Sequence, residues 1–136
     1  MTFSKIGILT LPAILFIGCS STPKDAVANM YDALKEGDVV KLANNTAETM
    51  SISLMSESLK DCSIDKKNYK DQINLTNDCL KEKYKNISYK DIKITDVSKN
   101  KAYAEVAVIQ NNNEILITFA VEKIDGKWMV SGRKRQ

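Results

Sequence analysis

Residues 101–130, with the sequence KAYAEVAVIQNNNEILITFAVEKIDGKWMV, decide the fold that the chain is expected to adopt. Apolar residues alternate along two runs, which consist of Ala102, Ala104, Val106 and Val108, then Ile115, Ile117, Phe119 and Val121. Such alternation is typical of strands with one buried face. Asn111–Asn113 separates the two runs and predicts a hairpin, because asparagine tolerates a positive φ. Strands joined so closely pair in antiparallel fashion.

Two further strands are expected beside this hairpin. Asp125–Gly126 predicts a second tight turn, after which Trp128 and Val130 share one face of a final strand. Upstream, residues 88–97 are predicted to form the first strand, and residues 98–100 the turn that follows it. The last third of the chain is therefore predicted to be a four-stranded antiparallel meander.

The chain before the sheet has helical periodicity. Thr22 is placed to cap a helix, with Pro23 in its first turn and Asp25 able to reach back to the cap. Gly37 is expected to end this helix. The residues predicted to form its buried face are Val27, Met30, Tyr31 and Leu34.

Two shorter helical segments are expected next, and a third segment is ambiguous. Asp38 can cap a short helix that ends at Asn44–Asn45, with inward positions at Val39, Leu42 and Ala43. The following helix is predicted to stack Ile52, Met55, Leu59 and Cys62 on one face, with Met50 and Leu54 alongside. Residues 63–70 are expected to form a loop. Residues 71–85 are a loop or a helix, for which Ile73, Leu80 and Tyr84 would form the stripe. Helices followed by a meander predict an α+β domain whose helices cover one face of the sheet.

Residues 1–18 have the features of an export signal. Lys5 gives a positive start, residues 6–17 are mostly apolar, and Gly18 precedes Cys19. The apolar run is too short for a hydrocarbon core of roughly 30 Å, which needs about 20 residues. The segment resembles the lipobox of bacterial lipoproteins, which predicts cleavage between Gly18 and Cys19 and acylation of the Cys19 sulfur. The alternatives are an ordinary signal peptide and an uncleaved apolar anchor.

Acylation of Cys19 would tether the remaining chain to a membrane. Residues 19–21 would be the acylated cysteine and a short linker, and residues 22–136 a single domain. Three extended residues reach only about 10 Å, so the domain is expected to lie against the bilayer. Ser20 after the cysteine resembles the outer-membrane sorting signal of enteric bacteria, which predicts an envelope protein facing the periplasm. The basic run Arg133–Arg135 is expected to contact anionic headgroups or to stay solvated.

Cys62 and Cys79 are predicted to form a disulfide. An even pair in an exported domain is most simply a structural bridge. A zinc site is disfavoured because the chain contains no histidine. A reactive thiolate is disfavoured because Asp61 and Asp78 directly precede the two cysteines, and a nearby anion raises the pKa of a thiol.

Several motifs together resemble a known family. They are Cys19–Ser21, Thr22–Val27, Tyr31–Asp38 and Ile124–Val130. These motifs are similar to a domain-of-unknown-function family of small bacterial lipoproteins with a nuclear transport factor 2-like, or cystatin-like, fold. The resemblance implies helices packed on a curved antiparallel sheet and a lipid-anchored location, and it implies no particular activity.

Two binding functions are expected ahead of catalysis. The first is non-catalytic binding of an envelope protein partner. The alternative is binding of a small apolar ligand or a lipid in a pocket between the sheet and the helices. The residues expected to line that pocket are Tyr31, Met55, Phe119 and Trp128, although all of them also suit plain core packing. No cofactor or metal is expected, and the oligomeric state is not predicted.

The composition disfavours catalysis and nucleic-acid binding. The chain has 20 Lys and Arg against 17 Asp and Glu, which is too even a balance for a concentrated basic face. Without histidine, no side chain has an ordinary pKa suited to proton transfer near neutral pH. Glu105 and Glu122 are the carboxylates that would suit acid–base work if they faced inward; otherwise they lie on the solvent face of the sheet.

Overall fold

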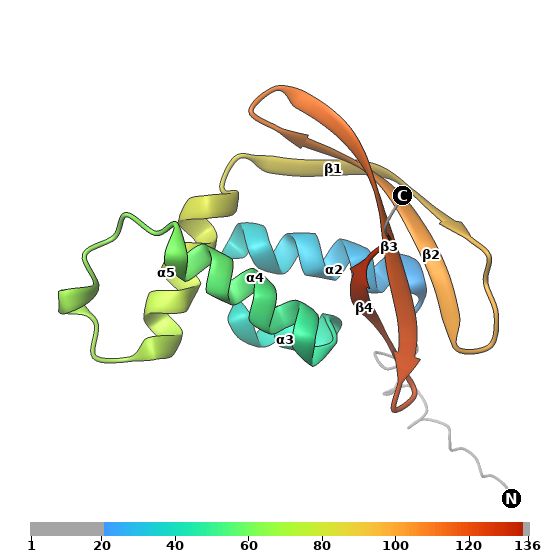
Figure 1. Ribbon diagram of the computed structural model, residues 1–136, viewed down its shortest axis with the longest axis horizontal. Helices are drawn as coiled ribbons and strands as arrows, with labels where there is room; N and C mark the ends of the chain where they lie inside the picture. The colour runs from blue at the N-terminus through green and yellow to red at the C-terminus, as the bar shows by residue number, and fades with distance from the viewer. Residues whose placement is uncertain (1–20, 135–136) are drawn as a thin grey trace, which may run out of the picture.

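The computed structural model describes residues 21–134, which form a helical layer followed by a sheet (Figure 1). The signal segment 1–18 and the predicted acylation site Cys19 lie outside the described residues. The elements, in chain order, are α2 (Pro23–Glu36), α3 (Val39–Asn45), α4 (Glu48–Lys60), the 3-10 helix η2 (Lys66–Asn68), α5 (Gln72–Tyr84), β1 (Ile87–Thr95), β2 (Lys101–Gln110), β3 (Asn113–Ile124) and β4 (Lys127–Arg133). Residues 71–85, for which the sequence left a loop or a helix open, therefore contain the helix α5.

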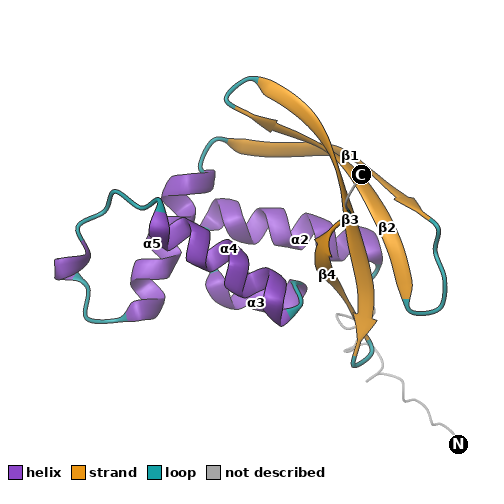
Figure 2. Cartoon of the chain, in the orientation of Figure 1, coloured by secondary structure: helices purple, strands orange, loops and turns teal. Residues whose placement is uncertain are grey.

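The strands form one antiparallel sheet in the order β1-β2-β3-β4 (Figure 2). The predicted α+β class and the predicted meander are confirmed. Among residues 21–134, no helix combines the length and the apolar character that crossing a bilayer requires.

The two tight hairpin turns, between β2 and β3 and between β3 and β4, use a left-handed backbone. Asn111 and Asn112 have φ values of 54° and 66°, and Asp125 and Gly126 have values of 51° and 79°. Two successive residues with positive φ form the turn whose twist matches that of the flanking strands. Asn113, which was expected in the turn, is instead the first residue of β3.

Helix α2 lies across the inner face of the curved sheet and supplies the centre of the core (Figure 1). The predicted inward residues that are buried are Val27, Met30, Tyr31, Leu34, Ala102, Ala104, Val106, Val108, Ile117, Phe119, Val121, Trp128 and Val130. Ile115 is the exception on β3, because it is 53% exposed near the β2–β3 turn. The alternation in the sequence therefore identifies the buried face of the sheet correctly, except at this end.

Both ends of α2 are fixed by the residues that the sequence predicted. The Asp25 N–H donates to Thr22 Oγ1 at 3.1 Å, and the Thr22 N–H donates to Asp25 Oδ2 at 3.2 Å. At the other end, Gly37 has a φ of 70° and lies directly against α5. A Cβ atom at Gly37 would collide with the backbone oxygen of Asn77 and would lie 2.8 Å from Lys81 Cβ. Only glycine fits this turn without displacing α5.

Helix α3 is held between α5 and the edge of the sheet. The Val39 N–H donates to Asn77 Oδ1 at 2.9 Å, so a side chain of α5 caps α3. After α3, Thr46 forms a β-bridge with Val130, and the Ala47 N–H donates to the Val130 carbonyl at 2.8 Å. This pairing covers part of the free edge of β4, which would otherwise offer unpaired backbone groups.

The inward face of α3 differs from the prediction. Ala43 is exposed, and Asn45 is buried in the last turn of the helix. The Asn45 amide is tolerated there because its Nδ2 donates to the Lys41 carbonyl at 2.8 Å and its Oδ1 accepts from Asn29 at 3.3 Å. A buried polar group that keeps its hydrogen bonds costs little.

The predicted apolar stripes of α4 and α5 are wrong at one position each. Ile52 is 51% exposed and Ile73 is 54% exposed, whereas Ser51 and Ser58 are buried on the inward face of α4. The Ser58 hydroxyl donates to the Leu54 carbonyl at 2.9 Å, so it needs no partner outside its own helix. On α4, small serine side chains with hydrogen bonds inside the helix therefore take the inward face on which periodicity had placed Ile52.

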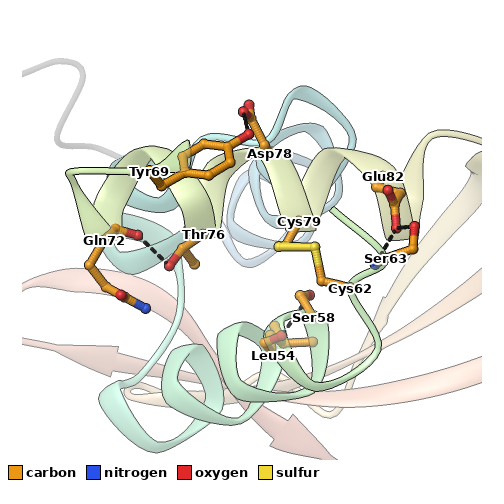
Figure 3. Close-up of a disulfide and its surroundings, with 10 residues drawn as sticks. All are labelled: Leu54, Ser58, Cys62, Ser63, Tyr69, Gln72, Thr76, Asp78, Cys79 and Glu82. Atoms are coloured by element: carbon orange, nitrogen blue, oxygen red, sulfur yellow. Dashed lines mark hydrogen bonds between the residues drawn. A yellow bond between two sulfur atoms is a disulfide. The ribbon is translucent and has the colours of Figure 1, made fainter. Parts of the chain in front are cut away.

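The predicted pairing of Cys62 with Cys79 is present and joins the end of α4 to the middle of α5 (Figure 3). Polar contacts surround it. Glu82 Oε1 accepts from the Ser63 N–H at 3.1 Å and from the Ser63 hydroxyl at 2.8 Å, and the Tyr69 hydroxyl donates to Asp78. The long connection between the two helices is thus attached to α5 at several points.

Candidate functional site

A cavity of about 420 Å³ lies between the helices and the inner face of the sheet, at the end that carries the β2–β3 turn. Its apolar walls come from α2 and α4 on one side and from β3 on the other, and include Met30, Leu34, Met50, Leu54, Ile115 and Ile117. Gln110, Asn111 and Asn113 form a polar rim beside the turn. This volume is within the range of about 300–1,000 Å³ that is usual for small-molecule sites.

Two tyrosines and a phenylalanine line the inner part of the cavity. The Tyr31 ring stacks on Tyr89 at 5.4 Å between centroids and meets the edge of Phe119 at 6.0 Å. Tyr31 is only 4% exposed and Tyr84 only 9% exposed. Burial raises the pKa of both hydroxyls, strongly for Tyr31, and the nearby Arg133 charge lowers the pKa of Tyr31 by a smaller amount. Both hydroxyls are therefore neutral and able to donate a hydrogen bond.

A β-bulge turns Arg133 toward the cavity. Val130 pairs with Val121, and Gly132 pairs with Ala120, so the pairing of β3 and β4 includes an extra residue on β4. Beyond this irregularity, Arg133 lies opposite Phe119 and joins the residues that line the cavity. Regular alternation from Trp128 and Val130 would have put Gly132 on the inner face instead. Bulges commonly re-aim a side chain in this way.

Positive charge predominates in the cavity. Lys83 and Arg133 both line it, and none of the lining residues within 21–134 is an aspartate or a glutamate. Lys83 Nζ is already paired with Asp61 Oδ2 at 2.7 Å, which raises the pKa of Lys83. Within the described part of the chain, Arg133 has no carboxylate in salt-bridge contact. Arg133 is itself exposed, so the cavity offers one guanidinium group at its solvent side that no described carboxylate pairs with.

The four residues predicted to line a pocket lie in three different places. Tyr31 and Phe119 line the cavity together. Met55 lies in a separate groove of about 290 Å³ between α4 and α5, because Met50 and Leu54 occupy the face of α4 that borders the cavity. Trp128 is buried in the core at the start of β4, where its backbone N–H donates to Ser21 Oγ at 3.2 Å.

Tyr84 and Arg133 line the cavity but were not predicted as pocket residues. Tyr84 lies at the end of α5, the segment whose secondary structure was left open. Arg133 reaches the cavity only through the bulge, for which Gly132 in a strand interior was the one available signal. Glu105 and Glu122 do not line the cavity; both are partly exposed, and they alternate with the buried residues of β2 and β3.

Within residues 21–134, no three His, Cys, Asp or Glu side chains gather closely enough to hold a metal ion. The fold and the cavity define the class of protein: an α+β domain with a mostly apolar cavity between a curved sheet and its covering helices. Residues 17–131 match the family described as "Domain of unknown function (DUF4878)", and the chain belongs to this family. The predicted membership of an unknown-function domain family is confirmed. Among curated proteins, none matches the chain.

Proposed function

We propose that this protein is a lipid-anchored envelope protein that binds a small apolar or amphipathic molecule in the cavity between its sheet and its helices. One observation carries the proposal: mostly apolar side chains of α2, α4 and β3 border a half-open cavity of about 420 Å³ between the helices and the sheet. Concave, mostly apolar sites of this size with a few polar groups are typical of small-molecule binding.

We also propose that the fold is of the nuclear transport factor 2-like, or cystatin-like, kind. Two features support this assignment. The helices precede the strands and cover the concave face of a four-stranded antiparallel meander. The cavity lies between those two layers, where a ligand site is expected in such a fold.

The anchor that we propose at Cys19 has a consequence for the orientation of the cavity. Ser21 Oγ accepts a hydrogen bond from the Trp128 N–H, which keeps Ser21 beside the start of β4. The rim residues Asn111 and Asn113 lie at the opposite end of β3, whose 12 residues span roughly 35 Å. A bilayer attached two residues before Ser21 would face away from the rim. This arrangement favours a ligand that arrives from the periplasm over one taken directly from the anchoring membrane.

The anchor is tested by metabolic labelling with palmitate in the native bacterium. The parent protein is expected to carry label in the envelope fraction, and the Cys19→Ala variant is expected to carry none. Equal labelling of the variant, or recovery of the parent protein from the cytosol, would contradict this part of the proposal.

The cavity is tested by photo-crosslinking with a diazirine-bearing decanol, using the full-length protein in lipid nanodiscs. Label is expected on peptides that contain cavity residues. Met50→Trp should reduce this labelling several-fold, because the indole would occupy space that the probe needs. Met55→Trp is the matched control, since Met55 lies on the same helix but in the separate groove. Labelling that is absent from the cavity, or equal in the two variants, would argue against ligand binding there.

Binding of an envelope protein partner is the second candidate function. It is favoured by the groove that Met55, Leu59 and Ile73 line on the helical layer, and by the exposure of Ile52 and Ile73. Photo-crosslinking from a benzoylphenylalanine at position 73 in intact envelopes tests it. A single discrete adduct from position 73, with none from position 116 on the sheet, would support this candidate.

A further inference from the structure

Two buried phenol hydroxyls line the same cavity without a hydrogen-bond partner. Neither the Tyr31 nor the Tyr84 hydroxyl bonds to any residue within 21–134, although Tyr31 is 4% and Tyr84 is 9% exposed. By contrast, the less buried Tyr89 hydroxyl donates to Asp32 Oδ1 at 3.1 Å. The Tyr31 and Tyr84 hydroxyls are therefore free to donate to a molecule that enters the cavity and supplies acceptors.

The charges around these hydroxyls specify the kind of acceptor. The bulge in β4 brings Arg133 to the cavity, where its charge lowers the pKa of Tyr31. The Tyr84 phenol is also close enough to affect that pKa, which it raises. Lys83 is compensated by Asp61, and the described lining residues include no aspartate or glutamate. The polar part of the cavity therefore offers O–H and N–H donors and one uncompensated positive charge.

We infer that this polar part binds the carboxylate of a fatty-acid-like ligand, whose alkyl chain lies along Met30, Leu34, Met50, Leu54, Ile115 and Ile117. This inference rests on the proposed function, because it specifies the ligand of the same cavity. A carboxylate carries the single negative charge that Arg133 balances. Its two oxygens accept from the guanidinium and from both phenols. A neutral alcohol would gain no ion pair with Arg133, and an ammonium would be repelled by its charge.

Competition against the diazirine probe tests the head group, with the full-length protein in nanodiscs and decanoate, decan-1-ol and decyltrimethylammonium as competitors. Arg133→Gln is expected to raise the decanoate concentration needed for half-displacement by about tenfold or more, since a charge-assisted hydrogen bond contributes at least that factor. The same variant should leave the value for decanol unchanged. Tyr31→Phe should raise the decanoate concentration needed for half-displacement severalfold. It should not lower the melting temperature, because it removes an unpaired buried hydroxyl.

Matched controls are available on the opposite face of the sheet. Lys134 Nζ lies 4.5 Å from the centre of the Tyr103 ring, and neither residue lines the cavity. Lys134→Gln removes the same charge as Arg133→Gln, and Tyr103→Phe removes the same hydroxyl as Tyr31→Phe. In both control variants, decanoate should displace the probe at the same concentration as in the parent protein.

The outcomes separate this inference from the proposed function. If decanoate and decanol compete but Arg133→Gln affects neither, the cavity binds apolar chains and the carboxylate site is wrong. Stronger competition by decyltrimethylammonium than by decanoate would overturn the carboxylate assignment in the same way, as would stronger, Arg133-dependent competition by decyl phosphate, which serves as a fourth competitor. If the probe labels no cavity peptide and no competitor has an effect, the proposed function fails as well.

Discussion

The β2–β3 hairpin and the α4–α5 pair are stabilised in different ways. The hairpin pairs ten residues of β2 with ten of β3 in unbroken register and closes with a two-residue turn. The α4–α5 pair buries Ser51, Ser58 and Thr76, leaves two isoleucines exposed, and is joined by a long connection and a disulfide. Alternating apolar residues and turn chemistry account for the hairpin. The helical pair depends on a covalent link and on side chains that bond to backbone.

This difference matters for the cavity, because each region supplies one of its walls. Ile115, Ile117 and Phe119 belong to the hairpin, whereas Met50 and Leu54 belong to α4. One wall is therefore part of a continuous hydrogen-bonded sheet, and the position of the other depends on how α4 is attached. We expect changes in the helical pair to alter ligand binding more than equally destabilising changes elsewhere.

The largest effect is expected where α2 meets the helical pair. Gly37→Ala should lower the free energy of unfolding by about 3–4 kcal/mol, because it combines left-handed strain with a clash against α5. Gly126→Ala is the control: its φ of 79° imposes similar strain, but a Cβ there meets nothing within 4 Å. The control should cost about 1 kcal/mol. Chemical denaturation measures both, and equal losses would mean that the contact with Asn77 contributes nothing.

Removal of the disulfide should separate the two regions. The bridge closes a separation of 17 residues, and the Cys62→Ala/Cys79→Ala variant should lose about 3 kcal/mol. Hydrogen exchange is expected to accelerate in α4 and α5, while the amides shared by β2 and β3 keep more of their protection. The reduced parent protein is the control and should behave like the variant. Uniform acceleration across the sheet would show that the two regions unfold as a single unit.

The buried serines of α4 give a third test. Ser58 is fully buried, so Ser58→Leu should cost about 2 kcal/mol by overpacking. Ile52→Ser, on the exposed face of the same helix, should change stability by no more than about 0.5 kcal/mol. Periodicity alone predicts the reverse order, because it put Ile52 inside. Thermal unfolding of the two variants decides between these orders.

The sequence predicted the sheet better than the helical pair, for a physical reason. Alternation has a period of two, so a strand with one apolar face leaves little doubt about its orientation, as along Val106–Val108 and Ile117–Val121. In α4, isoleucine and serine residues are interspersed on neighbouring faces. The choice of inward face then depends on contacts with α5 and β4, which a single helix does not reveal.

The cavity was predictable only in part. Tyr31 and Phe119 lie within regular elements, and their periodicity brings them to the inner face. Arg133 depends on one extra residue in β4, and Tyr84 on a helix whose stripe is weak. Met55 and Trp128 are apolar and inward-facing, but periodicity does not distinguish residues that line a cavity from residues that fill the core.

Acidification should destabilise the α4–α5 pair, and this is the smallest of the expected effects. Asp61 accepts a hydrogen bond from Lys83, which lowers its pKa below the ordinary value of 3.8. The Ser63 N–H and hydroxyl likewise lower the pKa of Glu82 below 4.5. A carboxyl group whose pKa is lowered by folding contributes stability above its unfolded pKa and loses it as the pH falls through its folded pKa. The junction between α4 and α5 should therefore weaken below about pH 4, with the sheet still intact.

Carbon-13 NMR of the carboxyl groups measures this weakening directly. The Asp61 and Glu82 signals should titrate below their ordinary pKa values, and the melting temperature of the Asp61→Asn/Glu82→Gln variant should fall less than that of the parent between pH 6 and pH 3. Lys83→Gln provides the control, because it removes the partner of Asp61 and leaves the two hydrogen bonds between Ser63 and Glu82 in place. Only the pKa of Asp61 should then return toward 3.8. Parallel melting curves for parent and double variant would show that the disulfide, not these exposed polar contacts, holds the junction together.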